Sequence, residues 1–90
     1  MRKAMVIVGK KSKMRYVTAC ITLFNKGERE VLLRARGRSI SNCIDVALLL
    51  KKSFYSNLKI KNIELGYDEA ELDGGRKRYV SFIEILITIH

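Results

Sequence analysis

The sequence predicts an α+β domain in two layers, with two helices on one face of a mixed sheet. Three observations support this fold class. Short apolar segments and two longer segments of helical periodicity follow one another in the order strand, helix, strand, helix, strand, strand. Two strands joined by a helix are expected to be parallel neighbours with a right-handed crossover. In the last strand one set of alternate positions is isoleucine and the other is mixed, so helices should cover only one face.

The first half of the chain supplies a strand–helix–strand unit. Met5–Val8 is a short apolar run that a glycine ends. An amphipathic helix is expected over about Ser12–Lys26, with its first serine able to cap it and Gly27 placed to end it. Glu30–Arg36 is the second strand, because its apolar residues share one parity. The chain as a whole, 1–90, has the length of one domain.

The second helix is expected over about Ile40–Tyr55. Gly37 separates it from the preceding strand and suits a tight turn, because glycine adopts positive φ without a steric penalty. Ser39 is the natural N-cap, its hydroxyl able to bond a free N–H of the first turn. Apolar residues cover nearly the whole circumference of this helix, which is more than one sheet face can bury. We therefore expect its second apolar side to meet another subunit.

The last third of the chain predicts a long hairpin. Leu58–Asp68 is extended, and its alternation changes within Ile60–Ile63, which indicates either a bulge there or a strand that begins near Lys61. The last strand is expected over Arg78–His90. Between these strands, Asp73–Gly75 is a turn signal. Few core candidates flank this turn, so the hairpin should project beyond the body as an arm.

The charge of the chain points to a polyanionic partner. The formal net charge is +9, and the first 27 residues contain no Asp or Glu. This one-sided excess favours nucleic acid over anionic lipid. No apolar run approaches the length that crosses a membrane.

The chemistry of the side chains argues against an enzyme. Cys20 and Cys43 lie within apolar helical patterns without a metal-ligand spacing, and His90 is the only histidine. No metal site, cofactor, small-molecule substrate or nucleophile–base pair is expected. The chain should belong to a reduced, intracellular compartment.

A phosphate site is predicted where the two parallel strands end. Lys10 and Lys11 follow the first strand, and Arg36 and Arg38 follow the second. Because the carboxyl ends of parallel strands share one edge, these cations should meet beside helix N-termini, which favour anions. The alternative is a basic loop that only keeps the protein soluble. The Gly-Lys-Lys-Ser segment lacks the first glycine and the final Ser or Thr of a P-loop, so nucleotide hydrolysis is not expected.

Phe54 stands at the end of the second helix. It is either a surface anchor or an ordinary buried phenylalanine. None of the aromatic residues forms an RNP-like pattern, so a base-stacking sheet is not indicated.

Short segments that include Gly9–Lys11, Leu23–Gly27 and Arg34–Ser41 stand out. Together they resemble the Alba family of archaeal DNA- and RNA-binding chromatin proteins. The Arg-Gly-Arg segment before the second helix is the most specific of them. The resemblance implies a βαβαββ fold like the C-terminal domain of a bacterial translation initiation factor, which agrees with the patterns above. The matching segments cover nearly the whole chain: Gly9–Lys11, Leu23–Gly27, Arg34–Ser41, Asp45–Val46, Phe54, Gly66 and Ser81–Ile85.

The resemblance implies a homodimer, or a heterodimer with a paralogue, that coats and packages double-stranded DNA without sequence preference and also binds RNA. The alternative is a protein that acts on structured RNA. Either would be cytoplasmic, and the first chromosome-associated. In some members of the family acetylation of a loop lysine weakens binding. The residues expected to contact nucleic acid are Lys10, Lys11, Lys13, Arg15, Arg36, Arg38, Arg76, Lys77 and Arg78.

Two further features follow from the resemblance. Phe54 matches the aromatic position by which neighbouring dimers pack side by side along DNA. The arm departs from the pattern, because its ascending side is acidic. These acids either pair with basic groups opposite or turn outward: Asp68, Glu69, Glu71 and Asp73.

Overall fold

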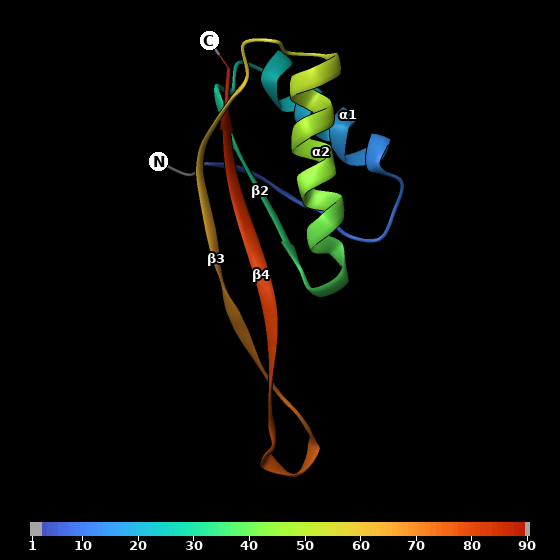
Figure 1. Ribbon diagram of the computed structural model, residues 1–90, viewed down its shortest axis with the longest axis vertical. Helices are drawn as coiled ribbons and strands as arrows, with labels where there is room; N and C mark the ends of the chain where they lie inside the picture. The colour runs from blue at the N-terminus through green and yellow to red at the C-terminus, as the bar shows by residue number, and fades with distance from the viewer. Residues whose placement is uncertain (1–2, 90) are drawn as a thin grey trace.

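The computed structural model describes residues 3–89 (Figure 1). The predicted order βαβαββ is confirmed. The predicted last residue of the final strand, His90, lies outside the described residues. The elements are β1 (Ala4–Ile7), α1 (Lys13–Asn25), β2 (Glu30–Arg36), a 3₁₀ turn (Gly37–Ser39), α2 (Ile40–Ser53), β3 (Lys59–Glu71), a second 3₁₀ turn (Asp73–Gly75) and β4 (Lys77–Thr88).

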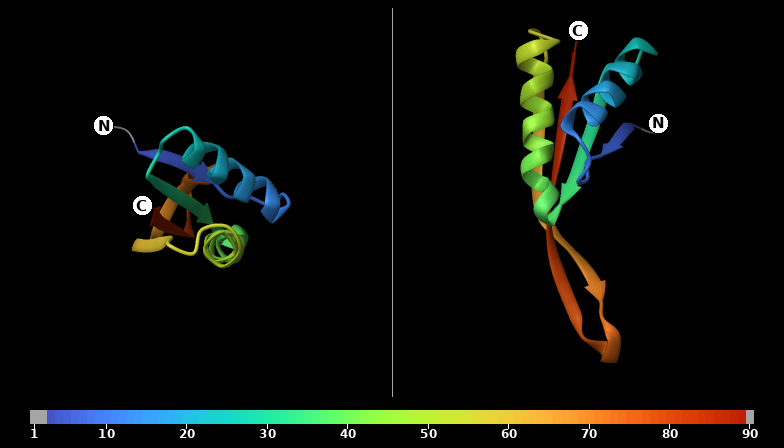
Figure 2. Two further views of the ribbon diagram at one scale, coloured as in Figure 1. Left: turned by 90° about the horizontal axis from the view of Figure 1, so that it is seen from above. Right: turned by 90° about the vertical axis from the view of Figure 1, so that its right-hand side faces the viewer.

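The four strands form one mixed sheet in the order β1-β2-β4-β3. β1 runs parallel to β2, as expected for two strands joined by a helix, and β4 is antiparallel to both β2 and β3. Both helices lie on one face of this sheet (Figure 2). The predicted two-layer α+β architecture is therefore confirmed.

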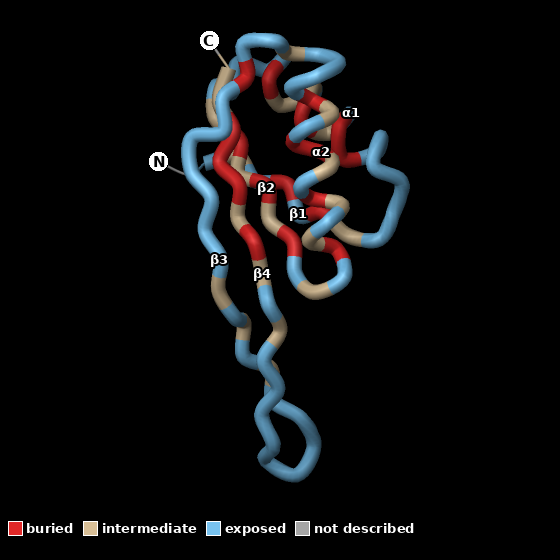
Figure 3. Tube along the Cα trace, in the orientation of Figure 1, coloured by how far each residue is buried: buried red, intermediate tan, exposed pale blue. Residues whose placement is uncertain are grey.

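The core lies between the helices and the central strands (Figure 3). Alternate residues of β2 and β4 face the helices, because successive side chains of a strand point to opposite faces of the sheet. Directly opposed residues of this antiparallel pair share a face, so the two strands contribute to the same core. The other face carries no helix. The fully buried side chains include Val17, Cys20, Val31, Leu33, Cys43, Val46, Leu50, Leu58 and Ile87.

Backbone hydrogen bonds and a tight turn define the end of α1 and the start of α2. Gly27 follows the C-cap of α1, and the N–H of Glu28 donates to the carbonyl of Leu23 over 3.1 Å in a Schellman pattern. Gly37 has a φ of +58°, as the tight turn after β2 requires. The predicted hydroxyl cap of Ser39 is wrong. The 3₁₀ turn leads directly into α2, so Ser39 has helical dihedrals and its side chain makes no capping hydrogen bond.

The hairpin of β3 and β4 extends beyond the helical layer as an arm (Figure 1). Its register shifts between Ile60 and Asn62, which confirms the bulge alternative. Gly66 lies opposite Phe82, and a Cβ at Gly66 would approach the ring to 2.7 Å. The absence of a side chain at Gly66 therefore leaves room for the ring of Phe82.

The two cysteines are predicted to be unreactive in the folded protein. Burial raises the pKa of Cys20 to about 12, with a further contribution from Cys43, and raises the pKa of Cys43 to about 11. Both thiols should resist a disulfide reagent at pH 8 until the protein unfolds. Because the unfolded thiols ionise first, the free energy of unfolding should decrease as the pH rises above about 8.5. Denaturation of the wild type and of Cys20→Ala/Cys43→Ala at several pH values measures this; an equal pH dependence would contradict it.

Candidate nucleic-acid interface

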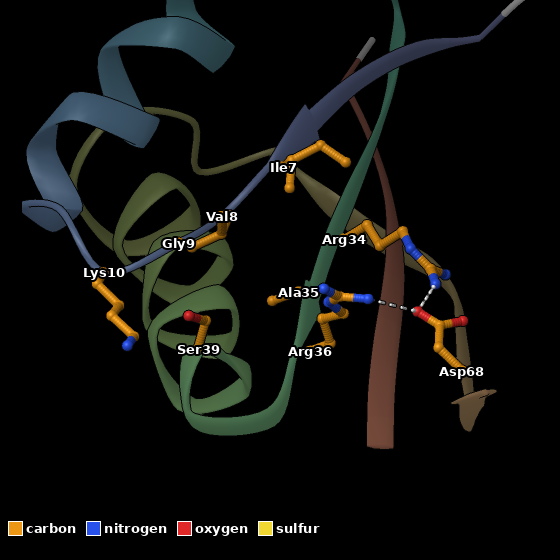
Figure 4. A pocket seen from close by; sticks show the side chains of 9 residues that line it. All are labelled: Ile7, Val8, Gly9, Lys10, Arg34, Ala35, Arg36, Ser39 and Asp68. Atoms are coloured by element: carbon orange, nitrogen blue, oxygen red, sulfur yellow. Dashed lines mark hydrogen bonds and ion pairs between the residues drawn. The ribbon is translucent and has the colours of Figure 1, made fainter. Parts of the chain in front are cut away.

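A cavity of about 550 Å³ opens where β1 and β2 end (Figure 4). It lies at the edge of the sheet that the sequence predicted, between the loop after β1 and the turn after β2. Its walls combine cationic, apolar and acidic side chains. They are Ile7, Val8, Gly9, Lys10, Arg34, Ala35, Arg36, Ser39 and Asp68.

Tertiary hydrogen bonds hold the lysine loop in place. The hydroxyl of Tyr16 in α1 accepts from the N–H of Lys11 over 3.1 Å. The side-chain amide of Asn42 in α2 donates to the carbonyl of Gly9 over 3.2 Å. Both helices therefore anchor a loop whose two lysine side chains remain exposed. Sequence reasoning did not identify Tyr16 or Asn42, because a single side-chain hydrogen bond to a loop backbone leaves no periodic signal.

The structure brings two of the four edge cations to the same cavity. Lys10 and Arg36 both line it, and the side chain of Arg36 is 64% exposed. Lys11 and Arg38 are exposed but do not belong to its lining. The site is therefore a pair of cations on the cavity wall, with two more on the adjoining surface.

Arg34, by contrast, is engaged by the protein itself. Its Nη1 lies 2.6 Å from Oε2 of Glu84, and its Nη2 lies 2.6 Å from Oδ2 of Asp68. Its guanidinium also lies 4.2 Å over the ring of Phe82. The hydrogen bond to Asp68 raises the pKa of Arg34 above its ordinary value, and Glu84 adds to this. Arg34 thus stays charged, and its Nη1 and Nη2 donate to carboxylates of the protein itself.

The acidic side of the arm is partly neutralised by ion pairs. Asp68 pairs with Arg34 and also lies 3.8 Å from Nη1 of Arg36. Glu69 pairs with Lys77 over 3.0 Å on the opposite strand. Within residues 3–89, neither Glu71 nor Asp73 forms an ion pair.

The other predicted contacts occupy separate surfaces. Lys13 pairs with Asp45 of α2 over 2.8 Å, whereas Arg15 is exposed on α1. The side chains of the basic segment 76–78 are exposed on the arm, away from the cavity. Phe54 is the C-cap of α2 and is 47% exposed, so it is not a buried core residue.

The fold and this site define a class of protein. It is a small, strongly basic α+β domain with a cationic cavity at one sheet edge and a projecting hairpin beside it. None of the helices in the described chain is long and apolar enough to cross a membrane.

The chain belongs to the Alba family, whose family model matches residues 3–66. It is 39% identical over 82 residues to the DNA/RNA-binding protein Alba of Methanocella arvoryzae, covering 91% of this chain and 85% of that protein. It is 43% identical over 83 residues to the protein of the same name from Methanococcus maripaludis, covering 91% and 93%. The resemblance noted in the sequence is thereby confirmed.

Solved structures show the same fold. Alba from Thermoplasma volcanium superposes with a TM-score of 0.86 at 34% identity, covering 93% of this chain and 98% of that one. ALBA1 from Trypanosoma brucei superposes with a TM-score of 0.79 at 27% identity, covering 99% of this chain and 71% of that one.

Proposed function

We propose that this protein binds nucleic acid through backbone phosphates, without sequence preference, and packages double-stranded DNA. The observation that supports this most directly is the cavity at the ends of β1 and β2, with Lys10 and Arg36 on its walls. Two relatives that share about 40% of its residues are named DNA/RNA-binding proteins. The exposed cations can neutralise phosphates, and such contacts supply affinity without reading bases.

We also propose that the protein acts as a dimer, with a second copy or with a paralogue. Ile63 and Leu65 of β3 lie opposite residues of β4 that pack beneath the helices, so they face the helical layer. No helix covers them, and they are 53% and 72% exposed. On α2, Ile44 and Leu48 are 39% and 50% exposed. Exposed apolar side chains of this kind, on both a strand and a helix, suit burial against another subunit.

Salt-dependent binding tests the proposed function. A dimer that presents Lys10, Lys11, Arg36 and Arg38 twice can contact about eight phosphates, so log K against log salt concentration should have a slope of about −5 to −7. Filter binding with several unrelated duplexes of equal length should give the same affinity. The same titration with a structured RNA at matched salt shows whether RNA is an equal or better ligand. A slope near zero, or strong discrimination between duplex sequences, would contradict the proposal.

Phe54 is proposed as the contact between neighbouring dimers on long DNA. Phe54→Ala should leave affinity for a duplex that holds one dimer nearly unchanged. On long DNA it should reduce cooperativity, because an exposed aromatic anchor contributes about 2 kcal/mol or more to an interface. Titrations on short and long duplexes measure the two effects separately. Unchanged cooperativity, together with a large decrease in melting temperature, would assign Phe54 a structural role instead.

The arm is proposed to follow a groove through its basic segment. Arg76→Ala/Arg78→Ala should lower duplex affinity at low salt and make the salt slope less steep by about one for each lost contact. Glu69→Gln/Glu71→Gln should strengthen binding, because two repulsive charges are removed. Filter binding at several salt concentrations compares both variants with the wild type. If neither differs from it, the arm does not contact nucleic acid and the edge cations act alone.

A further inference from the structure

An acidic side chain lies within the cationic cavity. Asp68 shares the lining with Lys10 and Arg36, and its Oδ2 lies 3.8 Å from Nη1 of Arg36 (Figure 4). A carboxylate at this position opposes phosphate binding, because like charges repel across a few ångströms. The positive charge of Arg34 does not require the carboxylate of Asp68 for its neutralisation, because Glu84 already pairs with that guanidinium. Its place beside these cations suits a ligand that carries a hydrogen-bond donor next to a negative charge.

The carboxylate of Asp68 is held in place, and one of its oxygens is available. Both cation contacts of Asp68 in the described chain are made by Oδ2. Arg34 is in turn held by Glu84 and by the ring of Phe82. Asp68 therefore pairs with a guanidinium whose position other side chains fix. The Asp68 side chain is 30% exposed. Oδ1 therefore keeps its acceptor capacity, on a residue that lines the cavity.

The two kinds of nucleic acid differ in the donor that this oxygen needs. Phosphate, ester and ring oxygens of a DNA backbone are all acceptors, so a carboxylate can only repel or ignore them. A ribose carries a 2′-hydroxyl next to its 3′-phosphate, and this hydroxyl both donates and accepts. A cation and a carboxylate side by side match that pair: Arg36 can bind the phosphate while Asp68 accepts from the adjacent hydroxyl.

We infer that Asp68 accepts a hydrogen bond from a ribose 2′-hydroxyl of bound RNA while Arg36 and Lys10 contact the neighbouring phosphates. This inference rests on the proposed function and adds a preference to it. The same carboxylate weakens DNA binding, because it brings its negative charge near the phosphates and finds no donor in the backbone. Asp68 is thus a residue that sets the ratio of RNA to DNA affinity at an otherwise non-specific site.

The experiment compares two RNA duplexes of the same sequence, one natural and one with 2′-fluoro ribose throughout. The fluorine removes the donor but keeps the A-form helix, so shape does not differ between the ligands. At matched salt the wild type should bind the natural duplex about fivefold to tenfold more tightly, as one hydrogen bond to a charged, partly exposed acceptor allows. Asp68→Ala should bind both duplexes equally and should bind DNA more tightly than the wild type does.

Two further variants control for charge and folding. Glu69→Gln removes one negative charge from the adjacent position, whose ion pair with Lys77 lies on the arm. It should strengthen binding of both RNA duplexes alike and keep the wild-type ratio between them. Asp68→Asn keeps an acceptor oxygen and is the conservative replacement if thermal unfolding shows that Asp68→Ala is not folded. It should keep part of the discrimination.

The outcomes separate this inference from the proposed function. If the wild type binds natural and 2′-fluoro RNA equally, or if Asp68→Ala still prefers natural RNA, the inference is wrong and salt-dependent phosphate binding remains. In that case the role of Asp68 is limited to its ion pairs with Arg34 and Arg36, which hold those side chains in position. If no duplex binds with salt-dependent affinity, the proposed function itself fails.

Discussion

Lys10→Glu/Arg36→Glu is expected to lower the affinity for duplex DNA at low salt by at least about a hundredfold. Both side chains line the cavity at the ends of β1 and β2. Among residues 3–89 Lys10 forms no ion pair, and the nearest carboxylate to Arg36 is that of Asp68, 3.8 Å away. In a dimer the double substitution removes four phosphate contacts and places four negative charges at the interface. The salt slope should therefore become less steep by about three to four.

A matched control makes this prediction specific. Lys26→Glu/Lys59→Glu causes the same change in net charge at two exposed positions. Lys59 lies at the other end of the sheet, because it pairs with Thr88, which in turn pairs with Glu30 at the start of β2. Lys26 is the C-cap of α1, shortly before that same end of β2. Filter binding over a salt series should show only a small decrease for the control. Equal losses in the two variants would mean that net charge, and not the cavity, determines binding.

Two leucines of α2 should respond to substitution in opposite ways. Leu50 is fully buried within one protomer, whereas Leu48 is 50% exposed on the proposed dimer surface. Leu50→Ala should lower the free energy of unfolding by about 2–5 kcal/mol, because it leaves a cavity in a packed core. Leu48→Glu should leave the protomer folded but dissociate the dimer, because it places a charge in an apolar interface.

Sedimentation and chemical denaturation at a fixed protomer concentration measure these two effects, since the stability of a dimer depends on concentration. Leu48→Glu should sediment as a folded monomer. Leu50→Ala should sediment as a dimer at denaturant concentrations at which it is still folded. A wild type that is monomeric at micromolar concentration would refute the dimer proposal. A Leu48→Glu variant that remains dimeric would place the interface elsewhere.

The order and type of the elements could be predicted from the sequence because they depend on neighbouring residues. Period-two and period-3.6 patterns located all four strands and both helices, and the parallel pairing of β1 and β2 followed from the helix that joins them. Gly37 marked the turn before α2, and the Gly74–Gly75 segment marked the end of the arm. The position of the cationic edge also followed, since parallel strands end on the same side.

Local reasoning was less successful where a distant segment determines the outcome. The hydroxyl cap of Ser39 was predicted from its position before the helix, but the 3₁₀ turn after β2 gives that residue helical dihedrals. The bulge in β3 could be located from its change of parity, yet only the pairing with β4 showed that the strand continues through it. In α2 the sequence indicated an excess of apolar surface, whereas packing decided that Leu50 is buried and Leu48 is exposed.

By itself, the sequence determined the fold class, the basic character and the edge at which the cations gather, because composition and periodicity are properties of short stretches. The resemblance of its motifs indicated the family. Only the tertiary structure decided which charges are available there. Arg34, Asp68 and Glu84 come from three strands, and their ion pairs form because β2, β4 and β3 are neighbours in the sheet. Arg34, which alternates with Arg36 in the sequence, is thus paired with two carboxylates, and Asp68 of β3 lines the cavity beside Arg36. Arg34 is separated along the chain from Asp68 by 34 positions and from Glu84 by 50 positions. These ion pairs therefore depend on the order of the strands in the sheet, which no local pattern encodes.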